Sequence, residues 1–111
     1  MNIEIPKIVR PLPLSDYAPE FGDVHLDVWV NPSRKLLEAI NQVAHQVVTT
    51  GLTPENAEES IEVIAQIWSC TPEEVSALIE HSADTDPKLF QWLLVRTFKM
   101  IRDHRLAVKK N

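Results

Sequence analysis

The chain has 111 residues and a formal net charge of −5 at pH 7, and 44% of its residues are hydrophobic and 24% charged. This length fits one domain, residues 1–111, with one hydrophobic core, and the composition excludes a disordered chain. Because the sequence has no run of about 18 apolar residues and Cys70 is its only cysteine, it also excludes a membrane-spanning helix and an internal disulfide, and it suits the cytoplasm.

Residues 1–30 contain the two segments with strand character. KIVRPLPL is rich in proline, which cannot donate to a sheet ladder, so we expect a short edge strand there. In VHLDVWV, residues 24–30, every second residue is apolar, which indicates a strand with one face on a core. The turn-rich SDYAPEFGD between them predicts a β-hairpin or an extended segment. Whether this part mediates self-association in a homo-oligomer stays open.

Residues 31–108 contain four signals of a helix start. Each is a residue that can cap free helix amides, followed by proline at a position where the missing amide does no harm. The four signals are Asn31-Pro32, Thr53-Pro54, Thr71-Pro72 and Asp86-Pro87. The third is the strongest, because Glu74 stands three residues after Thr71 and completes a capping box.

Apolar residues follow each of these signals at spacings of three and four. The first helix places its apolar residues between Leu36 and Val48 on one face and ends near Gly51. The fourth, from Pro87 to about Val108, is apolar on most sides at first and becomes basic later. The sequence therefore predicts an α+β fold that is mainly α, with a short N-terminal β-hairpin or extended segment followed by four helices in a small bundle.

Motifs of catalysis, metal binding and cofactor binding are missing from the sequence. The four histidines are scattered, without a His-x-x-x-His or Glu-x-x-His pair, and two glycines cannot build a phosphate-binding loop. Cys70 precedes the Thr71 cap and has no obvious histidine partner. We therefore expect no catalytic residues, no metal, no cofactor and no enzymatic activity.

Charge is distributed unevenly along the chain. Residues 96–111 carry six Lys and Arg residues and Asp103 as their only acidic residue, so the rest of the chain is acidic. Arg102, Arg105 and Lys109 recur at spacings of three and four, which would suit a nucleic-acid contact. Cations at a helix C-terminus also favour the helix dipole without any partner. An acidic body repels phosphates, so nucleic-acid binding is not expected.

The order of IPKIVRPLPLSDYAPEF, VWVNPSRKLL and DPKLFQWLLVRTFKMIRDHR along the chain resembles small tail assembly chaperones of tailed bacteriophages and prophages. The likeness spans most of the chain and is weakest in residues 52–84. It implies a non-enzymatic protein of the bacterial host cytoplasm that binds the long, helical tape measure protein and keeps it soluble. It also implies that the protein leaves as tail tube subunits, which are further candidate partners, polymerise, and that it is absent from the mature virion.

A small helical domain of this kind can hold an amphipathic partner helix in an apolar groove, where aromatic and arginine side chains are common anchors. The candidate partner-binding residues are Trp68, Phe90, Trp92, Phe98, Arg102 and Arg105. For each of the four aromatic residues the alternative is a place in the core. Two other functions stay open, a structural head-tail joining or tail-completion protein and a small DNA-binding regulator that uses the basic C-terminal helix.

Overall fold

The computed structural model describes residues 6–49, 51 and 57–110, and within them the chain forms a β-hairpin followed by four helices. The strands are β1 (Val9–Pro13) and β2 (His25–Trp29). Two short 3₁₀ helices, η1 (Leu14–Asp16) and η2 (Pro19–Phe21), lie in the loop between them. The helices are α1 (Arg34–Thr49), α2 (Ala57–Ile67), α3 (Pro72–Thr85) and α4 (Pro87–Lys110). The prediction of a mainly helical α+β fold with an N-terminal hairpin is confirmed.

The two strands pair antiparallel, with Leu12 opposite Leu26 and Val9 opposite Trp29. Leu12 and Val28 are buried and belong to the face that packs on the helices, whereas His25 and Asp27 are exposed on the other face. This alternation agrees with the pattern of VHLDVWV. Its first residue departs from the pattern, because Val24 precedes β2 and is 54% exposed.

Asn31 does not begin the first helix, which corrects the expected cap at Asn31-Pro32. Its side chain instead joins the N-terminal segment to the end of β2. The Oδ1 atom accepts bonds from the Ile8 amide at 2.7 Å and from Trp29 Nε1 at 2.9 Å, and Nδ2 donates to the Pro6 carbonyl at 2.9 Å. Ser33 caps α1 in its place, since its Oγ accepts from the Leu36 amide at 3.2 Å.

The first helix ends where the sequence predicts. Gly51 has φ +75°, a conformation that side chains with a Cβ atom rarely adopt, and its amide donates to the Gln46 carbonyl at 2.9 Å. The helix start expected at Thr53-Pro54 lies outside the described residues.

Thr71 and Glu74 form the predicted capping box at the start of α3. The Thr71 Oγ1 accepts from the Glu74 amide at 3.2 Å, and the Glu74 carboxylate accepts from the Thr71 amide at 3.2 Å. Asp86 separates α3 from α4, and α4 starts at Pro87 as expected. The Asp86 Oδ1 accepts from the Lys88 amide at 3.2 Å. The predicted helix starts at Thr71-Pro72 and Asp86-Pro87 are therefore confirmed.

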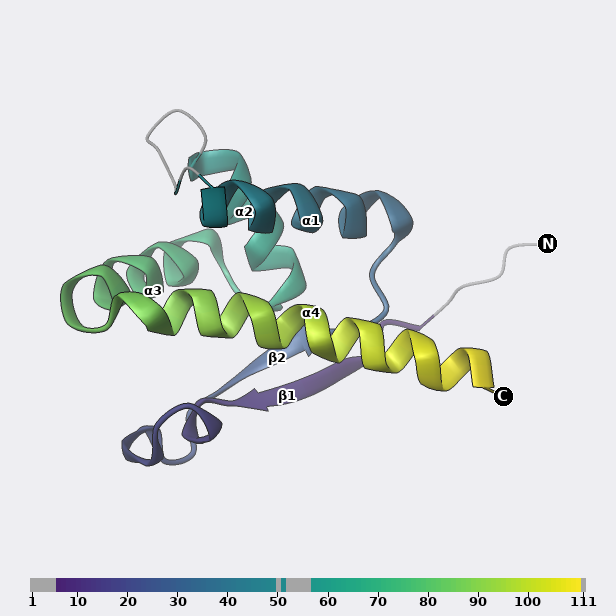
Figure 1. Ribbon diagram of the computed structural model, residues 1–111, viewed down its shortest axis with the longest axis horizontal. Coiled ribbons are helices and arrows are strands. Elements are labelled where there is room, and N and C mark those ends of the chain that lie inside the picture. Colours follow the sequence, from purple (N-terminus) through teal and green to yellow (C-terminus); the bar gives the residue numbers. More distant parts are fainter. Residues whose placement is uncertain (1–5, 50, 52–56, 111) are drawn as a thin grey trace.

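The fourth helix runs across the molecule, with α1 on one side and the hairpin on the other (Figure 1). Its inner face packs on β2 and on α3, and α1 contacts α2 more extensively than it contacts α4. Buried side chains from the hairpin and all four helices form one cluster. Space remains between α1 and the second half of α4.

Along the described ranges, every helix is too short or too polar to cross a membrane.

Candidate partner-binding groove

Two adjoining cavities form a groove between the first half of α1 and the second half of α4, and we call it the α1–α4 groove. Their volumes are about 600 and about 920 Å³, and both are lined by Leu37, Asn41, Ile101 and Arg105. The first cavity is completed by Val95, Phe98, Lys99, Arg102 and Leu106 on α4. The second extends along α1 to the end of β2 and adds Ile8, Val30, Asn31, Pro32, Arg34, Glu38 and His104. These volumes are in the range of sites that bind partners or ligands.

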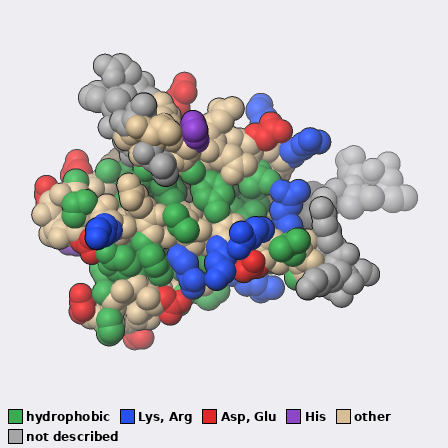
Figure 2. Space-filling view, viewed as in Figure 1, with side chains coloured by type: hydrophobic (Ala, Val, Ile, Leu, Met, Phe, Trp, Pro, Cys, Tyr) green, Lys and Arg blue, Asp and Glu red, His purple; other side chains and the backbone are tan. Residues whose placement is uncertain are grey.

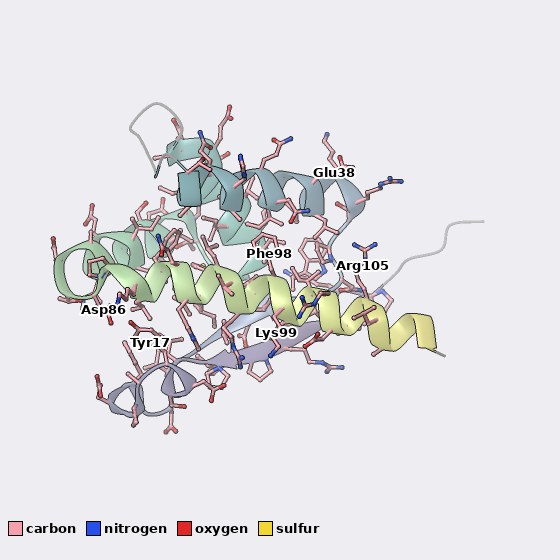
Figure 3. All side chains as sticks on the ribbon, viewed as in Figure 1. Tyr17, Glu38, Asp86, Phe98, Lys99 and Arg105 are labelled. Carbon is pink, nitrogen blue, oxygen red and sulfur yellow. The ribbon has the colours of Figure 1, made fainter. Side chains whose placement is uncertain are left out.

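The groove is apolar because α4 carries apolar residues beyond those that the core uses. Leu93 and Ile101 point into the core, and both are 2% exposed or less. Val95 and Leu106 lie on the outer side of the same helix and are 64% and 50% exposed. Phe98 lies between α1 and α4 and is half-buried (Figure 3). Val95 and Leu106 both line the first cavity, so apolar surface remains in water at this edge of the groove.

Basic side chains border this apolar surface. Lys99, Arg102 and Arg105 are exposed on α4 and line the groove. In Figure 2, hydrophobic side chains gather between the two helices and Lys and Arg side chains lie over α4 beside them. Across the groove, Arg34 forms an exposed ion pair with Glu38 at 3.6 Å, one turn apart on α1. Glu38 is the one carboxylate among the residues that line the two cavities.

Trp68 and Phe90 are core residues, which corrects their expected role in partner binding. They are 2% and 7% exposed, and their rings meet edge to face with centroids 5.9 Å apart. Trp68 Nε1 donates to the Thr97 Oγ1 at 2.9 Å, and Thr97 in turn donates to the Leu93 carbonyl at 2.7 Å. Because a partner cannot reach either ring without unfolding the core, we exclude both from the candidate site.

Trp92 lies outside the groove, against the loop between the strands. Its ring is half-buried, with the Tyr17 ring 5.2 Å away and the Arg96 guanidinium 5.6 Å from its centroid. Arg96 also forms an ion pair with Asp16 at 3.5 Å. The Trp92 side chain therefore fixes the loop to α4, and it does not line either cavity.

Tyr17 joins the same loop to the junction of α3 and α4. Its hydroxyl donates to the Asp86 Oδ2 at 2.5 Å, across 69 positions of the chain (Figure 3). The hydrogen bond and the negative charge of Asp86, together with burial, raise the pKa of Tyr17 above its ordinary value. The contacts of Tyr17 and Trp92 therefore attach the first half of α4 to the loop between the strands.

Two observations concern the groups that could bind a metal ion or act as a nucleophile. Within residues 6–49, 51 and 57–110, no three His, Cys, Asp or Glu side chains come together in a way that could hold a metal ion. Cys70 is partly buried, and burial and the neighbouring Glu74 raise the pKa of its thiol, which disfavours the reactive thiolate. The α1–α4 groove is therefore described by its shape, its apolar lining and its charges.

Sequence reasoning found three residues of the groove and missed others. Phe98, Arg102 and Arg105 were predicted to bind a partner, and all three line the groove. Val95, Lys99 and Leu106 were not singled out, although they share the spacing of three and four with those residues. Drawn on a helical wheel, this spacing shows an apolar and basic stripe opposite the core face of α4, which is a signal the sequence does contain.

Comparisons of this chain with protein-family models, with curated proteins and with solved structures find no match.

Proposed function

We propose that this protein is a non-enzymatic tail assembly chaperone of a bacteriophage or prophage, and that its α1–α4 groove binds a helical segment of the tape measure protein. The observation that supports this most is the apolar edge of the groove, where Val95 and Leu106 are 64% and 50% exposed. Such a protein works in the cytoplasm of the bacterial host and leaves before the virion is complete. The resemblance of the chain to these chaperones supplies the name of the partner.

The shape of the groove suits a helix. Its residues on α4 extend from Val95 to Leu106, which at 1.5 Å per residue is about 16 Å, or roughly three helical turns. On α1, Leu37 and Asn41 are one turn apart and supply the other wall. An amphipathic helix placed between them would cover the exposed apolar side chains and pack with Phe98 near its centre. The tape measure protein, as a long helical chain, offers many such segments.

The two alternative functions make different demands on the same surface. In a DNA-binding regulator, Lys99, Arg102 and Arg105 would bind phosphates. These cations border the apolar edge of the groove, and a phosphate backbone would leave that edge exposed to water. A head-tail joining or tail-completion protein would remain in the finished particle. The apolar edge of the groove therefore favours a protein partner over DNA. Of the remaining roles, the chaperone role predicts that this protein is released before the particle is complete.

Co-expression with the tape measure protein encoded by the same phage or prophage tests this proposal. We expect the tape measure protein to stay soluble and to co-purify with this chain. The variant Val95→Glu places a charge on the apolar edge and is expected to weaken retention at least about tenfold, since burying one valine is worth about 1.5 kcal/mol. The matched control is Val24→Glu, because Val24 is also an exposed valine, 54% accessible, and lies outside the groove.

The proposal fails if the tape measure protein is neither solubilised nor retained, or if Val95→Glu binds as well as Val24→Glu. Both variants should keep the helical circular dichroism spectrum of the wild type, because both side chains are exposed. Mass spectrometry of purified particles separates the structural alternative. A stoichiometric amount of this protein in virions would favour a joining or completion role over the chaperone role.

A further inference from the structure

We infer that the α1–α4 groove selects an amphipathic helix whose apolar face is flanked by acidic side chains. The inference rests on the proposed function, because it takes the groove to be the binding site, and it adds the chemistry of the segment that enters. Among the residues lining the two cavities, Arg34, Lys99, Arg102 and Arg105 are cationic, and Glu38 is the one carboxylate. The groove is thus basic although the chain as a whole has a net charge of −5.

The cations on α4 are available to a partner. Within the described part of the chain, neither Lys99 nor Arg105 takes part in an ion pair. Arg102 lies 3.8 Å from the carboxylate of its neighbour Asp103, and both side chains are more than half exposed. Ion pairs of this exposed kind contribute about 0–1 kcal/mol, so they do not prevent Arg102 from meeting a carboxylate of a partner.

The positions of the cations specify where acidic residues should stand. Lys99, Arg102 and Arg105 follow one another at intervals of three along α4, which covers about 9 Å of its length. A partner helix that lies along α4 repeats its own side chains every three and four residues. Two or three acidic residues with this spacing, beside the residues that pack on Val95 and Leu106, would therefore face the three cations.

The charge of the groove also disfavours other occupants. A helix flanked by lysine would place like charges against Lys99 and Arg105 and would be repelled. A second copy of the chain would bring acidic side chains, but its apolar helix faces pack in its own core and are not free to enter the groove. A duplex nucleic acid would meet the cations and leave the apolar edge in water. The acidic amphipathic helix satisfies both the apolar and the charged part of the surface.

Two synthetic helical peptides test this inference with the full chain. Both peptides have about 18 residues and the same apolar face of leucines. The positions that flank this face are glutamate in one peptide and lysine in the other. Fluorescence anisotropy of the labelled peptides should show at least about tenfold tighter binding of the glutamate peptide in about 50 mM salt. The preference should shrink in about 500 mM salt, because screening weakens exposed charges.

Charge-reversal variants provide the decisive comparison. The triple variant K99E/R102E/R105E should reverse the preference, so that the lysine peptide binds more tightly. The matched control R10E/K35E/K88E changes the net charge equally at three exposed cations that line neither cavity, and it should keep the preference of the wild type. Circular dichroism checks that both triple variants remain folded, as expected for exposed side chains.

Several outcomes would overturn the inference. It is wrong if the two peptides bind equally, if neither binds, or if the two triple variants behave alike. It is also wrong if a DNA duplex of about 20 base pairs binds more tightly than the glutamate peptide and displaces it. A charge preference without retention of the tape measure protein would refute the proposed partner and leave the selectivity intact. Retention without a charge preference would refute the selectivity alone.

Discussion

The buried hydrogen bond between Trp68 and Thr97 provides a quantitative test of the core. Thr97 is fully buried and Trp68 is 2% exposed, so neither group has access to water. In the variant Thr97→Val, the side chain keeps nearly the same volume but loses the oxygen that accepts from Trp68 Nε1. The indole N–H is then left buried without a partner, which should lower the free energy of unfolding by about 1–3 kcal/mol.

A second background isolates this hydrogen bond from changes in packing. Trp68→Phe removes the indole N–H and leaves a smaller ring, so it is destabilising by itself. In that background Thr97 has no indole to accept from, and Thr97→Val should cost far less than in the wild type. The difference between the two costs is the coupling free energy, for which we expect about 1–3 kcal/mol.

Urea unfolding monitored by far-ultraviolet circular dichroism measures these free energies for the wild type, both single variants and the double variant. Helical ellipticity is a suitable signal because it does not depend on the tryptophan that is replaced. The reasoning is refuted if Thr97→Val changes the free energy of unfolding by less than about 0.5 kcal/mol, or if its cost is the same in both backgrounds.

Two further predictions concern the cap of α3 and the loop of the hairpin. Thr71→Ala removes the acceptor of the Glu74 amide and should lower the free energy of unfolding by about 1 kcal/mol in urea, whereas an unchanged midpoint would contradict a capping role. The raised pKa of Tyr17 stabilises the fold below pH 10.0, its ordinary value, and this stabilisation is lost as the pH rises through the folded-state pKa. Urea midpoints measured between about pH 8 and pH 11 should therefore fall less for Tyr17→Phe than for its parent. Both the parent and the Tyr17→Phe variant should carry Cys70→Ala, because the pKa of that thiol is also raised. If the urea midpoint falls equally with pH in the two proteins, the Tyr17–Asp86 hydrogen bond is refuted.

Local signals in the sequence predicted the ends of several elements. Thr71 and Glu74 are three residues apart, so their capping box depends on no distant part of the chain. Gly51 ends α1 because of its own backbone freedom. Asn31 has the same local signal as a cap, yet it bonds to Ile8 and to the carbonyl of Pro6, 25 positions away. The residues next to Asn31 do not indicate that its side chain bonds to a distant segment in place of capping a helix.

The candidate site shows a similar division. The sequence indicates that α4 is apolar on most sides, but it does not indicate which side the hairpin covers. Trp68 and α3 pack on the side that holds Phe90, whereas Phe98 lines the groove. Trp68 looks like an anchor in the sequence because its size suits a hot spot. Its burial and its bond to Thr97, 29 positions away, show that it is internal.

The position of α4 against the hairpin has a consequence for how the protein matures on the ribosome. Leu12 and Val28 belong to the same cluster as Leu93, which is synthesised long after them. Translation of the 24 residues of α4 alone takes about 1–5 s at common elongation rates. For that time the apolar face of the nascent hairpin lacks the cover that α4 provides, and a two-stranded hairpin by itself is marginally stable in water. The packing of α4 on the hairpin is therefore completed only after α4 has left the exit tunnel, and until then part of the apolar face of the hairpin stays open to other proteins of the cell.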